Sequence, residues 1–175
     1  MIDYPILSNI DSPADLKQMN YSTLSRLSVE ISNYIQEVVE KVGGHYSSPL
    51  GVVDFTIALH YVYNSPVDKL IWDVGHQTYA HKIITGRRDS FITLRQDEGI
   101  SGFLRREESE YDAFGAGHAS TSISAGVGMA QARKLNGTSE RIISIIGDGA
   151  LTGGLAFEGL NNAAQIDGQF LIVLN

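Results

Sequence analysis

Residues 142–154 read Ile-Ile-Ser-Ile-Ile-Gly-Asp-Gly-Ala-Leu-Thr-Gly-Gly, and this stretch decides the fold. Its first five residues are β-branched except for one serine, which is typical of a strand buried on both faces. The strand breaks into a glycine-rich turn, a helical pattern follows over about 155–166, and a second apolar run covers 170–174. Strand, turn, helix and strand make one βαβ unit. We therefore predict an α/β fold with an open, mainly parallel sheet and helices on both faces.

The turn places one acidic residue, Asp148, after the first strand, where ligands of open parallel sheets bind. The spacing of Gly147, Gly149 and Gly153 is one residue too long for a dinucleotide fingerprint. A bare carboxylate would also repel a pyrophosphate, whereas an intervening Mg²⁺ would attract both. The backbone N–H groups of Gly149 and Ala150 would favour an anion. The pattern indicates a metal-bridged diphosphate, and an Asp-Gly turn in which Asp148 caps locally stays open as the alternative.

Composition restricts the class of protein. The chain has 175 residues, 43% of them hydrophobic, a net charge of -7 and no cysteine. The negative charge argues against a nucleic-acid surface, and the lack of cysteine excludes disulfides and thiolate metal sites. Residues 1–15 lack the pattern of a secretory signal, and no apolar run approaches the roughly 18 residues of a membrane span. We expect a cytoplasmic protein.

The end of the chain bears on domain organisation. The last predicted strand has no helix after it, although a parallel sheet needs helices on both faces. We therefore expect the amino-terminal portion of a longer protein, incomplete at its C-terminus. We expect an N-terminal arm and helices over 1–42 and a cofactor-binding domain over 43–175, in which 87–114 is a mobile loop.

The spacing of apolar residues and the signals for helix starts and stops predict further helices and strands. Ser12 and Pro13 mark a helix start. Ser124 and Gly128 lie one turn apart on another helix, so that a backbone or a cofactor could approach that face. We expect helices over 13–19, 22–42, 52–63, 78–85 and 120–135, a strand over 69–74, and a loop over 46–51.

Three of the five histidines, His45, His76 and His118, follow a glycine at the end of a predicted element. Imidazoles there can donate to phosphate and carbonyl oxygens and shuttle protons near neutral pH. A zinc site is the competing explanation, but the three lack local ligand spacing. His60 and His81 lie within predicted helices, where we expect a hydrogen-bonded structural role.

The turn resembles a motif of the transketolase superfamily. Gly147-Asp148-Gly149, followed by a helix and a strand that ends in Leu174-Asn175, is similar to its thiamine-diphosphate motif. The resemblance implies that Asp148 and a later asparagine bind Mg²⁺, which holds the cofactor's diphosphate. In that register Asn175 starts an Asn-Asp-Asn triplet, and the second protein ligand follows it.

Longer blocks resemble the 1-deoxy-D-xylulose-5-phosphate synthase family over nearly the whole chain from about residue 43. Ala119 departs from this pattern where serine is usual, and Leu104 where proline is usual, and neither change removes a proposed ligand. The similar blocks are 43–45, 59–64, 70–77, 85–88, 108–112, 117–118 and 120–126.

This resemblance implies a thiamine-diphosphate-dependent transferase. Such an enzyme decarboxylates pyruvate and joins the two-carbon unit to D-glyceraldehyde 3-phosphate. The products are CO₂ and 1-deoxy-D-xylulose 5-phosphate, a precursor for isoprenoid (terpenoid), thiamine and pyridoxal synthesis. It also implies a homodimer. The implied catalytic residues are His45, facing the substrates, and His76, which contacts the cofactor; Gly117, His118 and Ala119 line the cofactor, Asp148 binds Mg²⁺, and Gly149 and Ala150 meet the diphosphate.

Two alternatives stay open. One is transketolase-type ketol transfer between sugar phosphates, and the other is a non-catalytic, cofactor-binding fragment. The glutamate that activates the cofactor and the arginines for the substrate phosphate belong to family domains, pyrimidine-binding and C-terminal, that are absent from these residues. We therefore expect residues 1–175 alone to be inactive.

Overall fold

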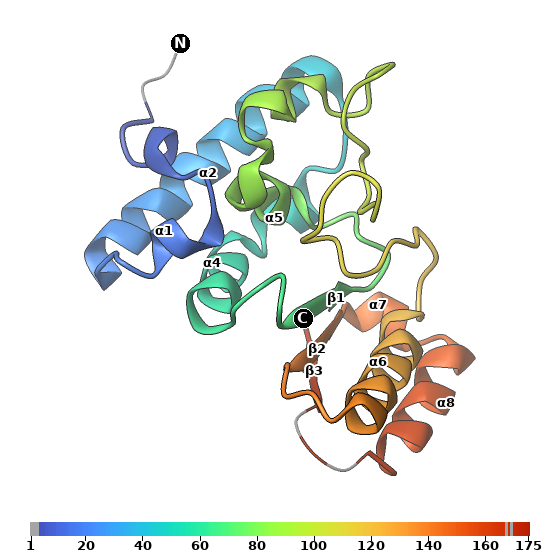
Figure 1. Ribbon diagram of the computed structural model, residues 1–175. Helices are drawn as coiled ribbons and strands as arrows, with labels where there is room; N and C mark the ends of the chain where they lie inside the picture. The colour runs from blue at the N-terminus through green and yellow to red at the C-terminus, as the bar shows by residue number, and fades with distance from the viewer. Residues whose placement is uncertain (1–3, 167, 169) are drawn as a thin grey trace. The chain divides into compact units, whose positions relative to one another are not determined.

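The computed structural model describes residues 4–166, 168 and 170–175. The chain divides into two compact units, one made of residues 1–64 with 76–102 and the other of residues 65–75 with 103–175. Each unit has a hydrophobic core of its own. Figure 1 traces the chain through both units.

The first unit is helical. Its longest element is α2, and several of the others are single turns. In chain order its elements are η1 (Leu7–Asn9), α1 (Pro13–Leu16), α2 (Tyr21–Val42), α3 (Ser47–Leu50), α4 (Val53–Val62), α5 (Tyr79–Lys82), η2 (Ile83–Arg87) and η3 (Asp89–Thr93).

Helix α2 forms because its apolar residues recur on one face. Leu27, Ile31 and Ile35 lie four residues apart and are fully buried. Asn20 caps the start, where its Oδ1 accepts a hydrogen bond from the Thr23 backbone N–H at 2.9 Å. Gly43, with a φ of 78°, ends the helix. The predicted helix over 22–42 is confirmed and begins one residue earlier.

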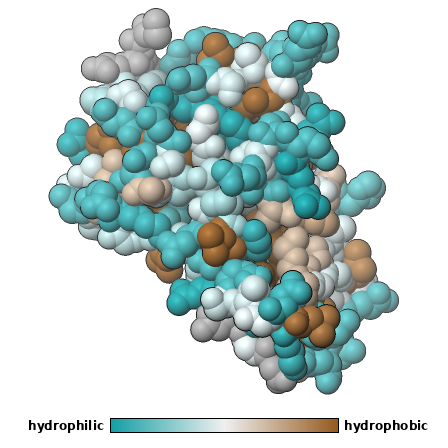
Figure 2. All heavy atoms as spheres, viewed as in Figure 1, coloured by the Kyte–Doolittle hydropathy of each residue, from teal (hydrophilic) through white to brown (hydrophobic). Residues whose placement is uncertain are grey.

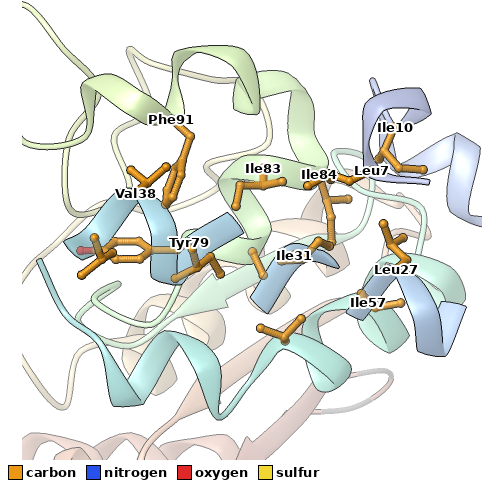
Figure 3. Close-up of a cluster of buried hydrophobic side chains, with 14 of the residues drawn as sticks. Leu7, Ile10, Leu27, Ile31, Val38, Ile57, Tyr79, Ile83, Ile84 and Phe91 are labelled. Carbon is orange, nitrogen blue, oxygen red and sulfur yellow. The ribbon is translucent and has the colours of Figure 1, made fainter. Parts of the chain in front are cut away.

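The core of the first unit collects apolar side chains from α2, α4, α5 and the short segments before and after them (Figure 3). Tyr79 is fully buried in this cluster, and its ring meets that of Phe91 edge-on, with the centroids 5.4 Å apart. The residues labelled in the figure are Leu7, Ile10, Leu27, Ile31, Val38, Ile57, Tyr79, Ile83, Ile84 and Phe91.

Three predicted elements of this unit differ in detail. The loop expected over 46–51 contains a helical turn, α3. The helix expected over 78–85 is α5 followed by the π-helical segment η2, which is interrupted at Thr85 and Gly86; Gly86 has a φ of 88°. The helix expected over 13–19 ends at Leu16.

The second unit contains a three-stranded parallel sheet in the order β1-β2-β3. Lys69, Ile142 and Phe170 lie side by side at its amino end, and the register continues to Ile146 beside Leu174. Its elements are β1 (Lys69–Trp72), α6 (Ser122–Asn136), β2 (Ile142–Ile146), α7 (Asp148–Leu151), α8 (Gly154–Ala163) and β3 (Phe170–Leu174).

Helix α6 packs closely on one face of this sheet, and α8 lies beside it (Figure 1). Gly126 allows the close approach, because a Cβ there would collide with the Ser144 hydroxyl and the Phe170 ring. Ser144 Oγ donates to the carbonyl oxygen of Ser122 at 2.8 Å, which ties the helix to β2. Gly128, the expected point of approach, is exposed and has no atom near its would-be Cβ.

The predicted α/β fold with an open, parallel sheet is therefore confirmed. The strands over 142–146 and 170–174 have the predicted bounds, and the glycine-rich turn between them holds the short helix α7. On the face shown in Figure 2, hydrophobic residues are scattered among hydrophilic ones. Within the described residues, no helix is both long and apolar enough to cross a membrane.

Candidate functional site

In the second unit, the carboxyl edge of the sheet brings Asp148 next to the end of β3. Asn175 continues β3 and donates its backbone N–H to the Ile146 carbonyl oxygen at 2.9 Å. Asp148 in turn donates its backbone N–H to the Asn175 carbonyl oxygen at 3.1 Å. Asp148 is exposed and begins α7. The backbones of Asp148 and Asn175 are thus in direct contact at this edge of the sheet.

The Asp148 carboxylate also makes a local contact. Its Oδ1 accepts a hydrogen bond from the Gly149 backbone N–H at 2.6 Å. This is the local capping that the sequence left open as the alternative to a metal site. Across the described part of the chain, no group of three or more His, Cys, Asp or Glu is placed to hold a metal ion. A cation here would therefore need further oxygen ligands besides this carboxylate, such as the later asparagine of the motif, a phosphate and water.

The backbone around this edge is open to a ligand. A Cβ built on Gly117, Gly147 or Gly149 would meet no atom within 4 Å. Gly117 and Gly149 are exposed. An elongated polar group could therefore approach these backbone atoms closely, which fits a diphosphate.

The loop that contains Gly117, His118 and Ala119 lies at the same edge. Gly117 has a φ of 99° and donates its backbone N–H to the Val74 carbonyl oxygen at 3.0 Å, just after β1. The exposed His118 accepts a hydrogen bond at its carbonyl oxygen from Thr121 Oγ1 at 3.1 Å. Directly after this loop, Ser120 Oγ donates to the carbonyl oxygen of Ala150 at 2.6 Å. The predicted cofactor-lining and diphosphate-binding segments of this unit are therefore joined.

In the first unit, the other two predicted residues form a pair. The rings of His45 and His76 meet edge-on, with centroids 5.3 Å apart and an interplanar angle of 61°. Burial, and then the nearby Arg95 guanidinium, lower the pKa of His45. Its imidazole is therefore neutral near pH 7 and can accept a proton.

The His45 loop is held by a buried tyrosine. Tyr79 Oη accepts a hydrogen bond from the His45 backbone N–H at 3.1 Å. Gly44, with a φ of 142°, lets the chain pass this hydroxyl, because a Cβ there would lie 2.8 Å from the oxygen. Tyr79 thus holds the backbone of His45 in place against the helical core of the first unit.

The two remaining histidines are internal to the first unit. His60 and His81 are fully buried, and His60 Nε2 lies 3.0 Å from His81 Nδ1. Burial, followed by the neighbouring His81, lowers the pKa of His60 well below its ordinary value. The predicted hydrogen-bonded structural role of this pair is confirmed.

A family model described as 1-deoxy-D-xylulose-5-phosphate synthase matches residues 7–175. The chain belongs to the 1-deoxy-D-xylulose-5-phosphate synthase family. The resemblance in the sequence is thereby confirmed, and it extends through the helices before residue 43.

Relatives named 1-deoxy-D-xylulose-5-phosphate synthase agree with this assignment. The protein from Methylibium petroleiphilum is 57% identical over 175 residues, which are 100% of this chain and 28% of the relative. The protein from Chromobacterium violaceum is 55% identical over 172 residues, 98% of this chain and 28% of the relative. The chain thus spans about a quarter of the length of these synthases.

A solved structure shares the fold. Transketolase from Leishmania mexicana superposes with a TM-score of 0.72 at 18% identity and covers 84% of this chain and 27% of its own. At that identity the likeness concerns the fold alone. It agrees with the transketolase-like architecture expected from the Gly-Asp-Gly turn.

Sequence reasoning missed two residues that shape these sites in this member of the synthase family. Tyr79 lies in a predicted helix, and its contact with His45 spans 34 residues, so no local pattern indicates it. Asp73, at the carboxyl end of β1, lies within the similar block 70–77. Its position after a strand is the signal that singled out Asp148 and could have identified it too.

Proposed function

We propose that this chain is the thiamine-diphosphate-binding part of a 1-deoxy-D-xylulose-5-phosphate synthase that requires Mg²⁺. The enzyme decarboxylates pyruvate and joins the two-carbon unit to D-glyceraldehyde 3-phosphate, giving CO₂ and 1-deoxy-D-xylulose 5-phosphate. It acts in the cytoplasm as a homodimer and supplies isoprenoid, thiamine and pyridoxal synthesis. Residues 1–175 alone do not catalyse this reaction.

One observation carries this proposal beyond family membership. The backbone hydrogen bond between Asp148 and Asn175 holds the proposed metal ligand beside the residue that starts the asparagine triplet, at the carboxyl edge of the sheet. Open parallel sheets bind ligands at that edge. The empty space over Gly117, Gly147 and Gly149 supports the approach of a diphosphate.

In the second unit, each residue has a proposed role in holding the cofactor. Asp148 would bind Mg²⁺ through its carboxylate, which accepts a hydrogen bond from the Gly149 backbone N–H in the structure. Gly149 and Ala150 would offer backbone N–H groups to the diphosphate. Gly117, His118 and Ala119 line the cofactor. Thiamine diphosphate, when bound, supplies the reactive carbon and the electron sink that decarboxylation needs.

In the first unit, the histidine pair has proposed roles in contact and proton transfer. His76 contacts the cofactor, and His45 faces the substrates. The lowered pKa of His45 keeps a neutral imidazole available as a proton acceptor. The edge-on contact of the two rings restrains both side chains.

The proposal is tested on the protein expressed from its complete gene, with thiamine diphosphate and Mg²⁺ added. Labelled pyruvate with D-glyceraldehyde 3-phosphate should give CO₂ and 1-deoxy-D-xylulose 5-phosphate, both followed by NMR. Turnover of a ketose phosphate donor without CO₂ release would instead identify a transketolase-type enzyme. Sedimentation analysis should give twice the monomer mass.

A further inference from the structure

Asp73 is a buried carboxylate at the carboxyl end of β1, outside the residues assigned to the cofactor above. It is 0% exposed and lengthens the sheet by donating its backbone N–H to the Ile145 carbonyl oxygen at 2.8 Å. A fully buried carboxylate is costly unless its oxygens are hydrogen-bonded. Its hydrogen bonds therefore indicate what it does.

Both oxygens of this carboxylate accept from the segment that leads into α6. Oδ1 accepts from the Ser120 backbone N–H at 2.7 Å, and Oδ2 accepts from the Ser122 backbone N–H at 2.8 Å. Ser120 and Ser122 are buried. Hydrogen bonds to a charged acceptor are stronger than those between neutral groups. Asp73 thus fixes the backbone immediately after the Gly117–Ala119 loop.

The fixed backbone is in an unfavourable conformation. Ser120 has a φ of 71°, which a residue with a side chain adopts at a cost. The same loop is held at its start by the hydrogen bond from the Gly117 N–H to the Val74 carbonyl oxygen. The first residue of the loop and the residue that follows the loop are thus both hydrogen-bonded to the chain just after β1.

Ser120 also contacts the segment that contains α7. Ser120 Oγ donates to the Ala150 carbonyl oxygen at 2.6 Å, within the turn that starts at Asp148. Gly153 also packs against Ser120, because a Cβ at that glycine would collide with the serine hydroxyl. A shift of Ser120 would therefore move both the Gly117–Ala119 loop and α7.

We infer that Asp73 is a positioning residue that sets the Gly117–Ala119 loop and α7 in the conformation that receives the diphosphate. This inference rests on the proposed function, and it adds a residue that does not itself touch the cofactor. A carboxylate is needed because an asparagine offers one acceptor oxygen and turns an N–H₂ group toward the other backbone N–H.

The experiment compares Asp73→Asn with a matched control, Asp68→Asn, in the protein expressed from its complete gene. Asp68 is a buried carboxylate at the other end of β1, and its Oδ1 accepts from the Arg141 backbone N–H at 2.8 Å. Both variants should lower the urea midpoint. Isothermal titration of thiamine diphosphate with saturating Mg²⁺ should give a Kd at least about tenfold higher for Asp73→Asn and within about twofold of wild type for Asp68→Asn.

The possible results separate this inference from the proposed function. A wild-type protein that binds no thiamine diphosphate overturns both. Wild-type affinity in Asp73→Asn, or an equal loss in Asp68→Asn, overturns the inference and leaves the proposed function standing. If Asp73→Asn does not fold, Ser120→Ala decides. That variant retains the N–H donor but lacks the hydroxyl, so its Kd should rise about two- to tenfold, and an unchanged Kd overturns the inference.

Discussion

The backbone N–H of Asp148 donates a hydrogen bond to the backbone carbonyl oxygen of Asn175 at 3.1 Å. Asp148 follows β2 after one glycine, Gly147, and Asn175 directly follows β3, so the hydrogen bond joins the ends of two strands. Because β2 and β3 are parallel and in register to Ile146 and Leu174, their ends meet at one edge. The sheet therefore fixes the backbone of Asp148, and only its side chain can change conformation when a ligand binds.

Replacing Asp148 should remove binding of thiamine diphosphate. We expect Asp148→Ala and Asp148→Asn to weaken Mg²⁺-dependent binding by more than about a hundredfold, because even indirect metal contacts contribute up to that factor. Calorimetry with Mg²⁺ and with a chelator measures the effect. Glu158→Gln, which removes another exposed carboxylate in α8, is the control. Unchanged affinity in either Asp148 variant would contradict the metal role.

Removing the hydroxyl of Tyr79 should affect His45 without affecting the second unit. In Tyr79→Phe the His45 backbone N–H loses its acceptor at 3.1 Å, at a cost of about 1 kcal/mol. In the protein expressed from its complete gene, we expect a lower melting temperature and a kcat for 1-deoxy-D-xylulose 5-phosphate formation reduced about fivefold, with the Kd of the cofactor unchanged. Tyr61→Phe, at a tyrosine that is 40% exposed, should match the wild type. A kcat equal to wild type would show that the hydroxyl does not position His45.

The sequence predicted those parts of the fold that depend on local period. The helix over 22–42 follows from apolar residues on one face, and the strands over 142–146 and 170–174 follow from short apolar runs. Helix α3 was missed because Ser47, Ser48 and Pro49 are turn-forming residues. Pro49 is tolerated there because it lies in the first turn, where a backbone N–H has no partner within the helix.

The candidate site was predictable only where a residue sits at the end of a recognisable element. Asp148 follows a clear strand and precedes glycine, so its position at the sheet edge could be deduced. The hydrogen bonds from Ser120 and Ser122 to Asp73 span 47 and 49 residues. Such pairings depend on tertiary packing, and neither composition nor spacing carries them.

The buried His60–His81 pair should make stability depend on pH. The pKa of His60 is lowered well below its ordinary value by burial and by His81, so the unfolded chain binds a proton that the folded chain does not. The free energy of unfolding should therefore fall as pH drops below about 6.5, by up to about 1.4 kcal/mol per pH unit for this group. Urea unfolding at several pH values between 5 and 8 measures the slope.

The control for this pH dependence is His60→Gln, which places an amide near His81 and does not titrate. Its stability at pH 8 is expected to be lower than that of the wild type, because the side chain differs in shape. Its slope below pH 6.5 should nevertheless be flatter. Equal slopes in the two proteins would assign the acid sensitivity to other groups.

Two glycines of α6 should respond oppositely to the same substitution. In Gly126→Ala the new methyl group collides with Ser144 Oγ and the Phe170 ring, so that the helix must move off the sheet. We expect a loss of about 1–3 kcal/mol in the free energy of unfolding, as for other overpacked sites. Gly128→Ala places its methyl group in open space on the same helix and should gain about 0.5–1 kcal/mol from helix propensity. Urea unfolding decides the sign of each change.

The same two substitutions should differ in their effect on cofactor binding. Helix α6 begins at Ser122, whose backbone N–H donates to Asp73. Gly126→Ala should therefore also raise the Kd for thiamine diphosphate, whereas Gly128→Ala should not. Equal effects of the two substitutions on stability would contradict the close packing of α6 on β2.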